Sequence, residues 1–243
     1  MSVERFGRTF LGGTAYALVT LVGADVGDTD VVGVYRIDGP AATTPVADIG
    51  AFSLANPPDT DFFVPTGVQY AMETCRGDLL VTDGHHNRIL RVTTGGEITE
   101  VATLGNVVPT GLETQGRTVW FTEAGPVPHL PDTGKVLRLD VQTGQTHDVA
   151  AGGRLLVDVE LGGHRLYALA QGVFTPGNPE GFPADPDTGQ LLRATRGGGF
   201  QVVAEGLDQP TSVDIVRGTA YVVTLDGEVW TVDLDGHRGH GQR

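Results

Sequence analysis

Three things are scarce in this sequence: cysteine, long apolar runs and helical periodicity. Cys75 is the only cysteine, which excludes an intramolecular disulfide and a cysteine-ligated metal site. Residues 1–8 lack the apolar core of a signal peptide, and no stretch approaches the roughly 18 apolar residues of a membrane span. No apolar pattern is sustained at the 3.6-residue helical period. We therefore expect a soluble, cytoplasmic protein that is not helical.

Positive charge is also scarce. The 243 residues include 16 Lys and Arg against 30 Asp and Glu, which gives a formal net charge of −14, and Lys135 is the only lysine. An acidic surface repels nucleic acid and anionic membranes, so neither is an expected partner. The same surface is ordinary for a soluble protein, and the charge therefore does not identify a partner by itself.

Glycine is abundant, with 36 residues, and it punctuates a repeated unit. The segment Val-Pro-Thr-Gly occurs at 64–67 and again at 108–111. Between the two copies, the apolar run from Val68 and three later segments have strand character, and turn residues separate them. Four short strands at this spacing are typical of one β-propeller blade, which needs further blades beside it to bury its faces.

The rest of the chain supplies similar units. We predict an all-β, NHL-like β-propeller with five recognisable four-stranded blades, in a single domain over residues 1–243. The blades occupy about 2–50, 64–106, 107–153, 154–206 and 207–234. Residues 51–63 form a connector and 235–243 a frayed tail. The last blade has only three strand segments, so the ring either closes with a ragged seam or lacks a part.

Topology predicts which loops share an end of the blades. Loops between second and third strands lie at the same end as the links between blades, and in this chain they are the long ones: 23–30, 84–87, 124–134 and 171–189. Insertions that gather at one end of a repeat fold usually mark its binding face. We therefore expect the functional site at this mouth of the central channel.

The first candidate group is Asp83-Gly84-His85-His86-Asn87. We assign His85 to acid or base chemistry, and His86 and Asn87 to ligand binding, because adjacent imidazoles near a carboxylate can move protons or bind a metal. The alternative is an ordinary surface turn, which also favours Asp, Gly and Asn.

The second group is Glu123 with His129, in a loop stiffened by three prolines. A carboxylate and an imidazole at one mouth suit general acid and base catalysis, and a salt contact on the rim is the alternative. Phe174, in the longest of the four loops, is assigned to ligand binding.

The third group consists of small polar residues near the starts of blades, which line the channel in a propeller. We assign three of them to ligand binding: Thr66, Thr110 and Thr211. Three others are oxygen donors that suit one Ca²⁺ or Mg²⁺ ion in the central channel: Asn106, Asp158 and Asp214. Polar residues that merely line a wet channel are the alternative interpretation.

Four segments carry a family resemblance: 61–72, 82–88, 106–111 and 123–131. Together they resemble the ScyD/ScyE family of propeller proteins, which is related to NHL-repeat proteins, and the resemblance covers nearly all of the chain. It implies a six-bladed ring in full-length members, of which this chain lacks roughly the first blade. It implies no catalytic residues, and it implies that members are often exported.

Two functions remain open at this point, because propeller architecture serves many activities. The first is a binding module that holds a small molecule or a protein partner at the channel mouth. The alternative is a metal-dependent lyase or lactonase-like hydrolase that uses Glu123, His129 and His85 at the same mouth. An open ring would also leave an edge for a second copy of the chain, and an oligomer is then expected.

Overall fold

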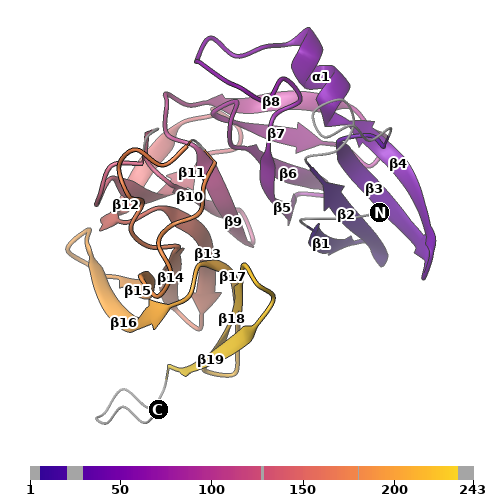
Figure 1. Cartoon of the computed structure of the whole chain (residues 1–243). Helices are drawn as coiled ribbons and strands as arrows, with labels where there is room; N and C mark the ends of the chain where they lie inside the picture. Colours follow the sequence, from indigo (N-terminus) through magenta and orange to yellow (C-terminus); the bar gives the residue numbers. More distant parts are fainter. Residues whose placement is uncertain (1–5, 21–29, 127–128, 180, 235–243) are drawn as a thin grey trace. The chain divides into compact units, whose positions relative to one another are not determined.

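The structure is a computed structural model that describes residues 6–20, 30–126, 129–179 and 181–234 (Figure 1). Two compact units are present: unit 1 comprises residues 1–119 and 139–146, and unit 2 comprises residues 120–138 and 147–243. That both belong to one propeller domain stays a prediction. The one helix in the described part of the chain has seven residues, and no helix there is long and apolar enough to cross a membrane.

Two four-stranded antiparallel sheets lie in unit 1, and in each the strands neighbour one another in chain order. The first consists of β1 (Phe6–Leu11), β2 (Thr14–Val19), β3 (Gly33–Gly39) and β4 (Ala42–Asp48). The second consists of β5 (Gln69–Cys75), β6 (Asp78–Asp83), β7 (Arg88–Val92) and β8 (Ile98–Thr103).

Three further sheets follow the same order. One consists of β9 (Pro109–Gln115), β10 (Thr118–Glu123), β11 (Gly134–Leu139) and β12 (Thr146–Gly153). The next, in unit 2, consists of β13 (Leu156–Gly162), β14 (Arg165–Ala170), β15 (Gly189–Ala194) and β16 (Phe200–Leu207). The last, also in unit 2, has three strands in the described residues: β17 (Pro210–Val216), β18 (Thr219–Thr224) and β19 (Val229–Asp233).

These sheets confirm the predicted all-β class and the predicted blades. The fifth sheet has three strands, as its three segments in the sequence indicated. Part of the predicted loop 23–30 and the predicted tail 235–243 lie outside the described residues.

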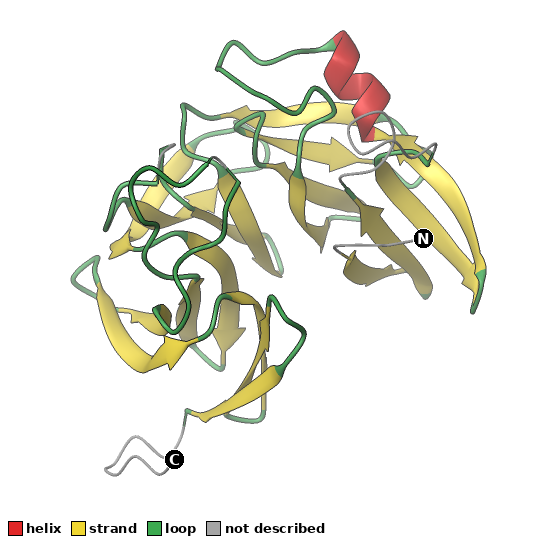
Figure 2. Cartoon of the chain, viewed as in Figure 1, coloured by secondary structure: helices red, strands yellow, loops and turns green. Residues whose placement is uncertain are grey.

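The short helix is a correction to the predicted connector 51–63 (Figure 2). Helix α1 spans Ile49–Ala55, and the Asp48 carboxylate caps it by accepting from the Ala51 N–H at 2.7 Å. Ile49 and Ser53 face inward on consecutive turns and are buried. Seven residues are two turns, too few for a 3.6-residue pattern to stand out from chance, so periodicity did not reveal this helix.

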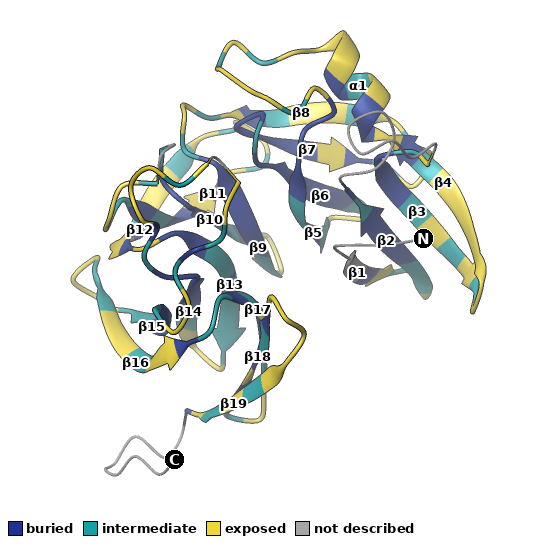
Figure 3. Cartoon of the chain, viewed as in Figure 1, coloured by how far each residue is buried: buried dark blue, intermediate teal, exposed yellow. Residues whose placement is uncertain are grey.

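Each unit is held by apolar side chains that alternate along its inner strands. In unit 1, Leu79 and Val81 of β6 pack with Leu90 and Val92 of β7, and all four are fully buried. Second and third strands such as β6 and β7 are buried along most of their length, whereas fourth strands such as β8 are mostly exposed or half-buried (Figure 3). The second and third strands therefore lie between layers, and their near-continuous apolar character follows from that position.

The fourth strands share a sequence feature that the sequence analysis missed. The pair Val-Ala occurs at 46–47, 101–102, 149–150 and 203–204, always in a fourth strand. In three sheets the register skips the valine, so Val46, Val101 and Val203 are bulged and the alanine pairs with the third strand. A bulge turns the strand locally, and a small alanine fits beside the buried third strand.

Truncation of a buried leucine tests this core. Leu169→Ala in β14 removes a fully buried side chain of the unit 2 core. We expect the free energy of unfolding to fall by about 2–5 kcal/mol in urea titrations. Val202→Ala, at a side chain that is 44% exposed on β16, is the control. We expect it to change the stability by less than about 1 kcal/mol. Equal losses in the two variants would contradict this assignment of the core.

Candidate functional site

The Asp83-to-Arg88 segment of unit 1 contains a buried ion pair. Arg88 Nε donates to Asp83 Oδ2 at 2.9 Å, and the two side chains are 2% and 0% exposed. The other Asp83 oxygen accepts from Gln69 Nε2 at 3.0 Å. The remaining Arg88 nitrogens donate to Ser53 Oγ and to the Asn56 carbonyl, at the end of α1. This pair therefore fastens the connector helix to the second sheet.

His86 belongs to the same network. Its Nε2 lies 3.1 Å from the Val64 carbonyl, which can only accept, so Nε2 carries the proton. Nδ1 lies 3.1 Å from Arg88 Nη2 and 3.3 Å from Asp83 Oδ2. The edge of Phe62 packs against the imidazole with ring centroids 5.0 Å apart. These contacts give the buried His86 a structural role, and its predicted ligand binding stays a prediction.

Asn87 also has protein partners. Its Oδ1 accepts from the N–H groups of Val107 and Val108, at 3.1 and 2.9 Å, and its Nδ2 donates to Thr60 Oγ1. Val108 has φ of 52°, which is rare for a β-branched residue, and the Asn87 amide holds it at the start of the third sheet. These hydrogen bonds give Asn87 a structural role, and its predicted ligand binding stays a prediction.

His85 is the more accessible histidine of this turn. It is half-buried, and its ring packs against Phe63 with centroids 4.5 Å apart and against Tyr70 with centroids 6.2 Å apart. Phe63 is 51% exposed. Gly84 is required here because a Cβ atom would lie 2.3 Å from the Tyr70 ring. The turn therefore presents an aromatic surface on unit 1.

Glu123 occupies the same place in β10 that Asp83 occupies in β6: each is the last residue of a second strand. No arginine pairs with Glu123 in the described residues. Lys135, whose positive charge acts on Glu123, donates to Asp148 at 2.9 Å. Burial raises the pKa of Glu123 to about 7, while the positive charge of Lys135 lowers it. No hydrogen bond to this carboxyl group is seen within the described part of the chain.

The structure brings His129 and Phe174 together, from two different loops of unit 2. Their rings meet edge to face, with centroids 5.6 Å apart and planes at 74°. Phe174 is 5% exposed and His129 is half-buried. Glu123, His129 and Phe174 thus all belong to unit 2, whereas the third predicted catalytic residue, His85, belongs to unit 1.

The predicted threonine ligands differ in their surroundings. Thr110 is buried, and Thr211 donates to the Val223 carbonyl at 3.1 Å within its own sheet. Thr66 is buried, and its hydroxyl has no hydrogen-bond partner among the residues that the structure describes. Of the three threonines, Thr66 is therefore the one whose buried hydroxyl group receives no hydrogen bond from the described residues.

The predicted cation ligands are not seen as a group. Asp158 accepts from the backbone N–H of Val159 and of Val213, both at 2.9 Å, so its carboxylate ties β13 to β17. Asp214 is exposed on unit 2, and Asn106 is exposed on unit 1. In the described ranges, no three His, Cys, Asp or Glu side chains gather to hold a metal ion. The calcium or magnesium site therefore stays a prediction.

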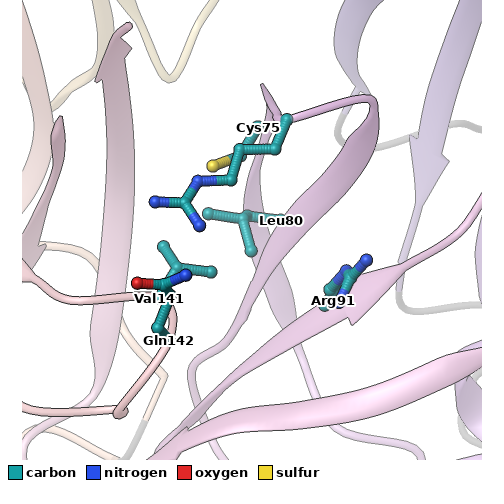
Figure 4. Close-up of a pocket in the computed structure, with 6 residues that line it drawn as sticks. Cys75, Leu80, Arg91, Val141 and Gln142 are labelled. Carbon is teal, nitrogen blue, oxygen red and sulfur yellow. The ribbon is translucent and has the colours of Figure 1, made fainter. Parts of the chain in front are cut away.

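A pocket that the sequence did not indicate lies at the other end of β6 (Figure 4). It has a volume of about 410 Å³. Its lining residues come from the β5–β6 turn, the following strands and the turn after β11: Cys75, Arg76, Leu80, Arg91, Val141 and Gln142. Arg91 is held by Asp78, and burial raises the pKa of the Cys75 thiol, which keeps it protonated.

Removal of Arg88 tests the buried ion pair. Arg88→Ala leaves the Asp83 charge buried without its counter-ion, so we expect the free energy of unfolding to fall by about 3–5 kcal/mol in urea titrations. Arg91→Ala is the matched control, because this arginine is half exposed in its pair with Asp78. An exposed pair contributes at most about 1 kcal/mol. If the two variants lost the same stability, the structural role of Arg88 would be wrong.

Glu123 predicts a pH dependence of stability. A carboxyl group whose pKa rises from 4.5 in the unfolded chain to about 7 in the folded chain holds its proton more tightly when folded. Stability therefore falls as the pH rises from about 4.5 to 7, by up to about 3 kcal/mol. Glu123→Gln should remove this loss, so the variant should exceed the wild type at pH 8 and match it near pH 4. Parallel pH profiles for the two proteins would contradict the assignment.

Comparison with known proteins supports the architecture alone. The chain matches no protein-family model and no curated protein sequence. Solved structures do match it. One is a chain in the crystal structure of a nidogen/laminin complex, with a TM-score of 0.64 and 14% identity. That match covers 96% of this chain and 77% of the other chain.

Two lyase structures are also similar. A streptogramin B lyase gives a TM-score of 0.54 at 14% identity, covering 97% of this chain and 70% of the lyase. The virginiamycin B lyase from Staphylococcus aureus gives 0.54 at 15% identity, covering 98% and 72%. Identities this low show a shared fold and no shared function. Together with the order of the sheets, these likenesses show that the chain has a β-propeller fold.

Proposed function

We propose that this chain is a binding module whose ligand site in unit 2 lies around Glu123, His129 and Phe174. The observation that carries the proposal is the Glu123 carboxyl group, which is 6% exposed and whose pKa is raised by burial to about 7. Burial makes a carboxyl group costly to ionise, and strongly shifted carboxyl groups in folded proteins call for an explanation. A bound ligand that hydrogen-bonds to Glu123 supplies one.

The loops beside Glu123 are braced, as a preformed site requires. In the first, Thr133 Oγ1 donates to the Leu130 carbonyl at 2.7 Å, and Arg154 Nε donates to Asp132 at 3.0 Å. These contacts fix the chain on the C-terminal side of His129. A ligand meeting His129 therefore does not have to order this part of the loop, which lowers the entropic cost of binding.

The second loop is braced in the same manner. The Gln171 side chain accepts from the Ala184 N–H at 3.0 Å, and Gln209 Nε2 donates to the Ala184 carbonyl at 2.6 Å. Thr188 Oγ1 accepts from the Val173 N–H at 2.9 Å, next to Phe174. Phe174 is thus held in place by the loop as well as by its contact with His129.

The chemistry of Glu123, His129 and Phe174 indicates which kind of ligand the site would bind. A carboxyl group with a pKa near 7 both donates and accepts hydrogen bonds at neutral pH, and it favours a polar hydrogen or a cation. The half-buried His129 ring, packed edge to face on the buried Phe174, suits contact with a planar apolar group. Leu130 and Phe182, on the same two loops, are 53% and 55% exposed. The site therefore suits a ligand, or a side chain of a protein partner, that joins a planar apolar part to a hydrogen-bond donor.

The family relationship and the enzymatic alternative have different amounts of support. On its four motif segments, we infer that the chain is related to the ScyD/ScyE propellers. The metal-dependent lyase or hydrolase has less support, because the described residues offer no group of three metal-binding side chains. The likeness to the two lyases is one of fold at 14% and 15% identity. A binding role is the function that the geometry supports best.

A fragment screen tests the proposed site. The full chain is screened by ligand-observed NMR against small aromatic amines, amides and alcohols, and dissociation constants are measured for the hits. We expect Phe174→Ala and Glu123→Gln each to weaken binding at least about tenfold, which corresponds to about 1.4 kcal/mol. His147→Ala changes an exposed histidine of β12 in the same unit and should leave binding unchanged.

The variants are first shown to be folded by circular dichroism and by their unfolding transitions. Hits that bind Phe174→Ala and Glu123→Gln as tightly as the wild type would place the binding surface elsewhere. A complete lack of hits that depend on these residues would count against a small molecule and leave the protein side chain as the occupant to test.

A further inference from the structure

The pocket in unit 1 takes no part in the network around Arg88. It lies at the opposite end of β6 from Asp83, where the β5–β6 turn and the turn after β11 both line it (Figure 4). All of its lining residues belong to unit 1. Its volume of about 410 Å³ falls within the range of about 300–1,000 Å³ that is usual for small-molecule sites. The pocket is therefore large enough to hold a small ligand.

The floor of the pocket is apolar. Leu80 is 1% exposed and Cys75 is 5% exposed, and Val141 adds an aliphatic side chain from the turn after β11 (Figure 4). Burial raises the pKa of the Cys75 thiol, so the thiol is neutral at physiological pH and behaves as a small apolar group. The apolar part of a ligand would leave water favourably here.

Three polar side chains of the lining have donors to spare. Arg76 and Gln142 are exposed, and neither the Arg76 guanidinium nor the Gln142 side-chain amide makes a hydrogen bond or an ion pair with the residues that the structure describes. Arg91 Nε donates to Asp78 Oδ2 at 2.6 Å, and Arg91 Nη2 donates to the same oxygen. Arg91 Nη1 is therefore left for another acceptor.

The β5–β6 turn fixes the position of Arg76. Arg76 and Gly77 have φ of 54° and 90°, as a type I′ turn requires of its two central residues. Cys75 pairs with Asp78 across this turn. The backbone thus sets where the Arg76 side chain begins, and only the side chain itself has to be ordered when a ligand binds.

The turn after β11 is fixed as well. Asp140 Oδ1 accepts from the N–H groups of Gln142 and Thr143, at 2.9 and 3.3 Å. Gly144 packs on β8, where a Cβ atom would lie 2.4 Å from the Val101 carbonyl oxygen. The wall that this turn contributes to the pocket is therefore in place before a ligand binds.

Two carboxylates lie near the pocket, and neither forms an ion pair with Arg76. Asp78 is bound by Arg91. The pKa of Asp140 is lowered by the hydrogen bond from the Gln142 N–H and, to a smaller extent, by the charge of Arg76, so Asp140 is ionised at neutral pH. Its carboxylate is bound by its own turn. Among the lining residues, Arg76 is therefore the cation whose donors remain available.

We propose that this pocket binds a small organic acid whose carboxylate pairs with Arg76 and whose apolar body packs on Leu80 and Val141. The planar guanidinium matches a carboxylate through two parallel hydrogen bonds. The Gln142 amide and Arg91 Nη1 are further donors in the same lining. This site lies in unit 1 and does not depend on the proposed ligand site in unit 2.

Matched pairs of probes test the proposal with the full chain. Benzoate, naphthoate and isovalerate are each compared with the corresponding primary amide, which keeps the shape and removes the charge. Binding is followed by ligand-observed NMR, and the site is located by the methyl resonances of Leu80 and Val141. We expect at least one carboxylate to shift both sets of resonances and to bind at least about tenfold more tightly than its amide. Added salt should weaken this binding.

Two variants at equivalent turns locate the charge. Arg76→Asn removes the guanidinium and keeps the turn, because Asn-Gly is a favoured type I′ sequence. This variant should bind the carboxylate at least about tenfold more weakly. Arg217→Asn is the matched control, because Arg217 and Gly218 form the same kind of turn in unit 2, with φ of 51° and 83°. It should bind the carboxylate like the wild type, and circular dichroism should show both variants folded.

Three results would overturn the proposal. The first is that none of the three carboxylates binds in a saturable manner. The second is equal affinity for the acid and the amide in every pair. The third is equal affinity of Arg76→Asn and Arg217→Asn for the carboxylate, because the charge of Arg76 would then have no part in binding.

Discussion

The burial of apolar strand faces between neighbouring layers is the constraint on which each unit depends. A four-stranded sheet has two faces, and second strands such as β6 and β14 are apolar on both. Leu79, Val81, Leu90 and Val92 in unit 1, and Leu169 and Leu191 in unit 2, reach full burial because other elements pack on them. No single blade would be stable alone, since one of its apolar faces would meet water.

The burial of the strands also determines the surroundings of the polar groups at their ends. Asp83 and Glu123 hold equivalent places, and both leave solvent because the strands around them do. Asp83 accepts hydrogen bonds from Arg88 and Gln69, and Arg88 in turn anchors the connector helix. Glu123 has only a shared lysine, and burial raises its pKa to about 7. The same position in the repeat thus has a structural role in one blade, and in another blade its carboxyl group is available for chemistry.

The sequence by itself determined the all-β class, the blades and most strands, because turn residues and apolar alternation are local signals. It also placed Glu123, His129 and Phe174 at strand ends and in long loops. It could not separate His85 from His86, since adjacent residues differ only in the direction each side chain takes within the folded turn. The tertiary structure decided that His86 joins the network around Arg88 and that Asn87 holds the start of the third sheet. It also decided that Asp158 ties two strands together and that no arginine pairs with Glu123 in the described residues. Those outcomes depend on which groups approach from distant parts of the chain, and only folding brings them within hydrogen-bonding distance.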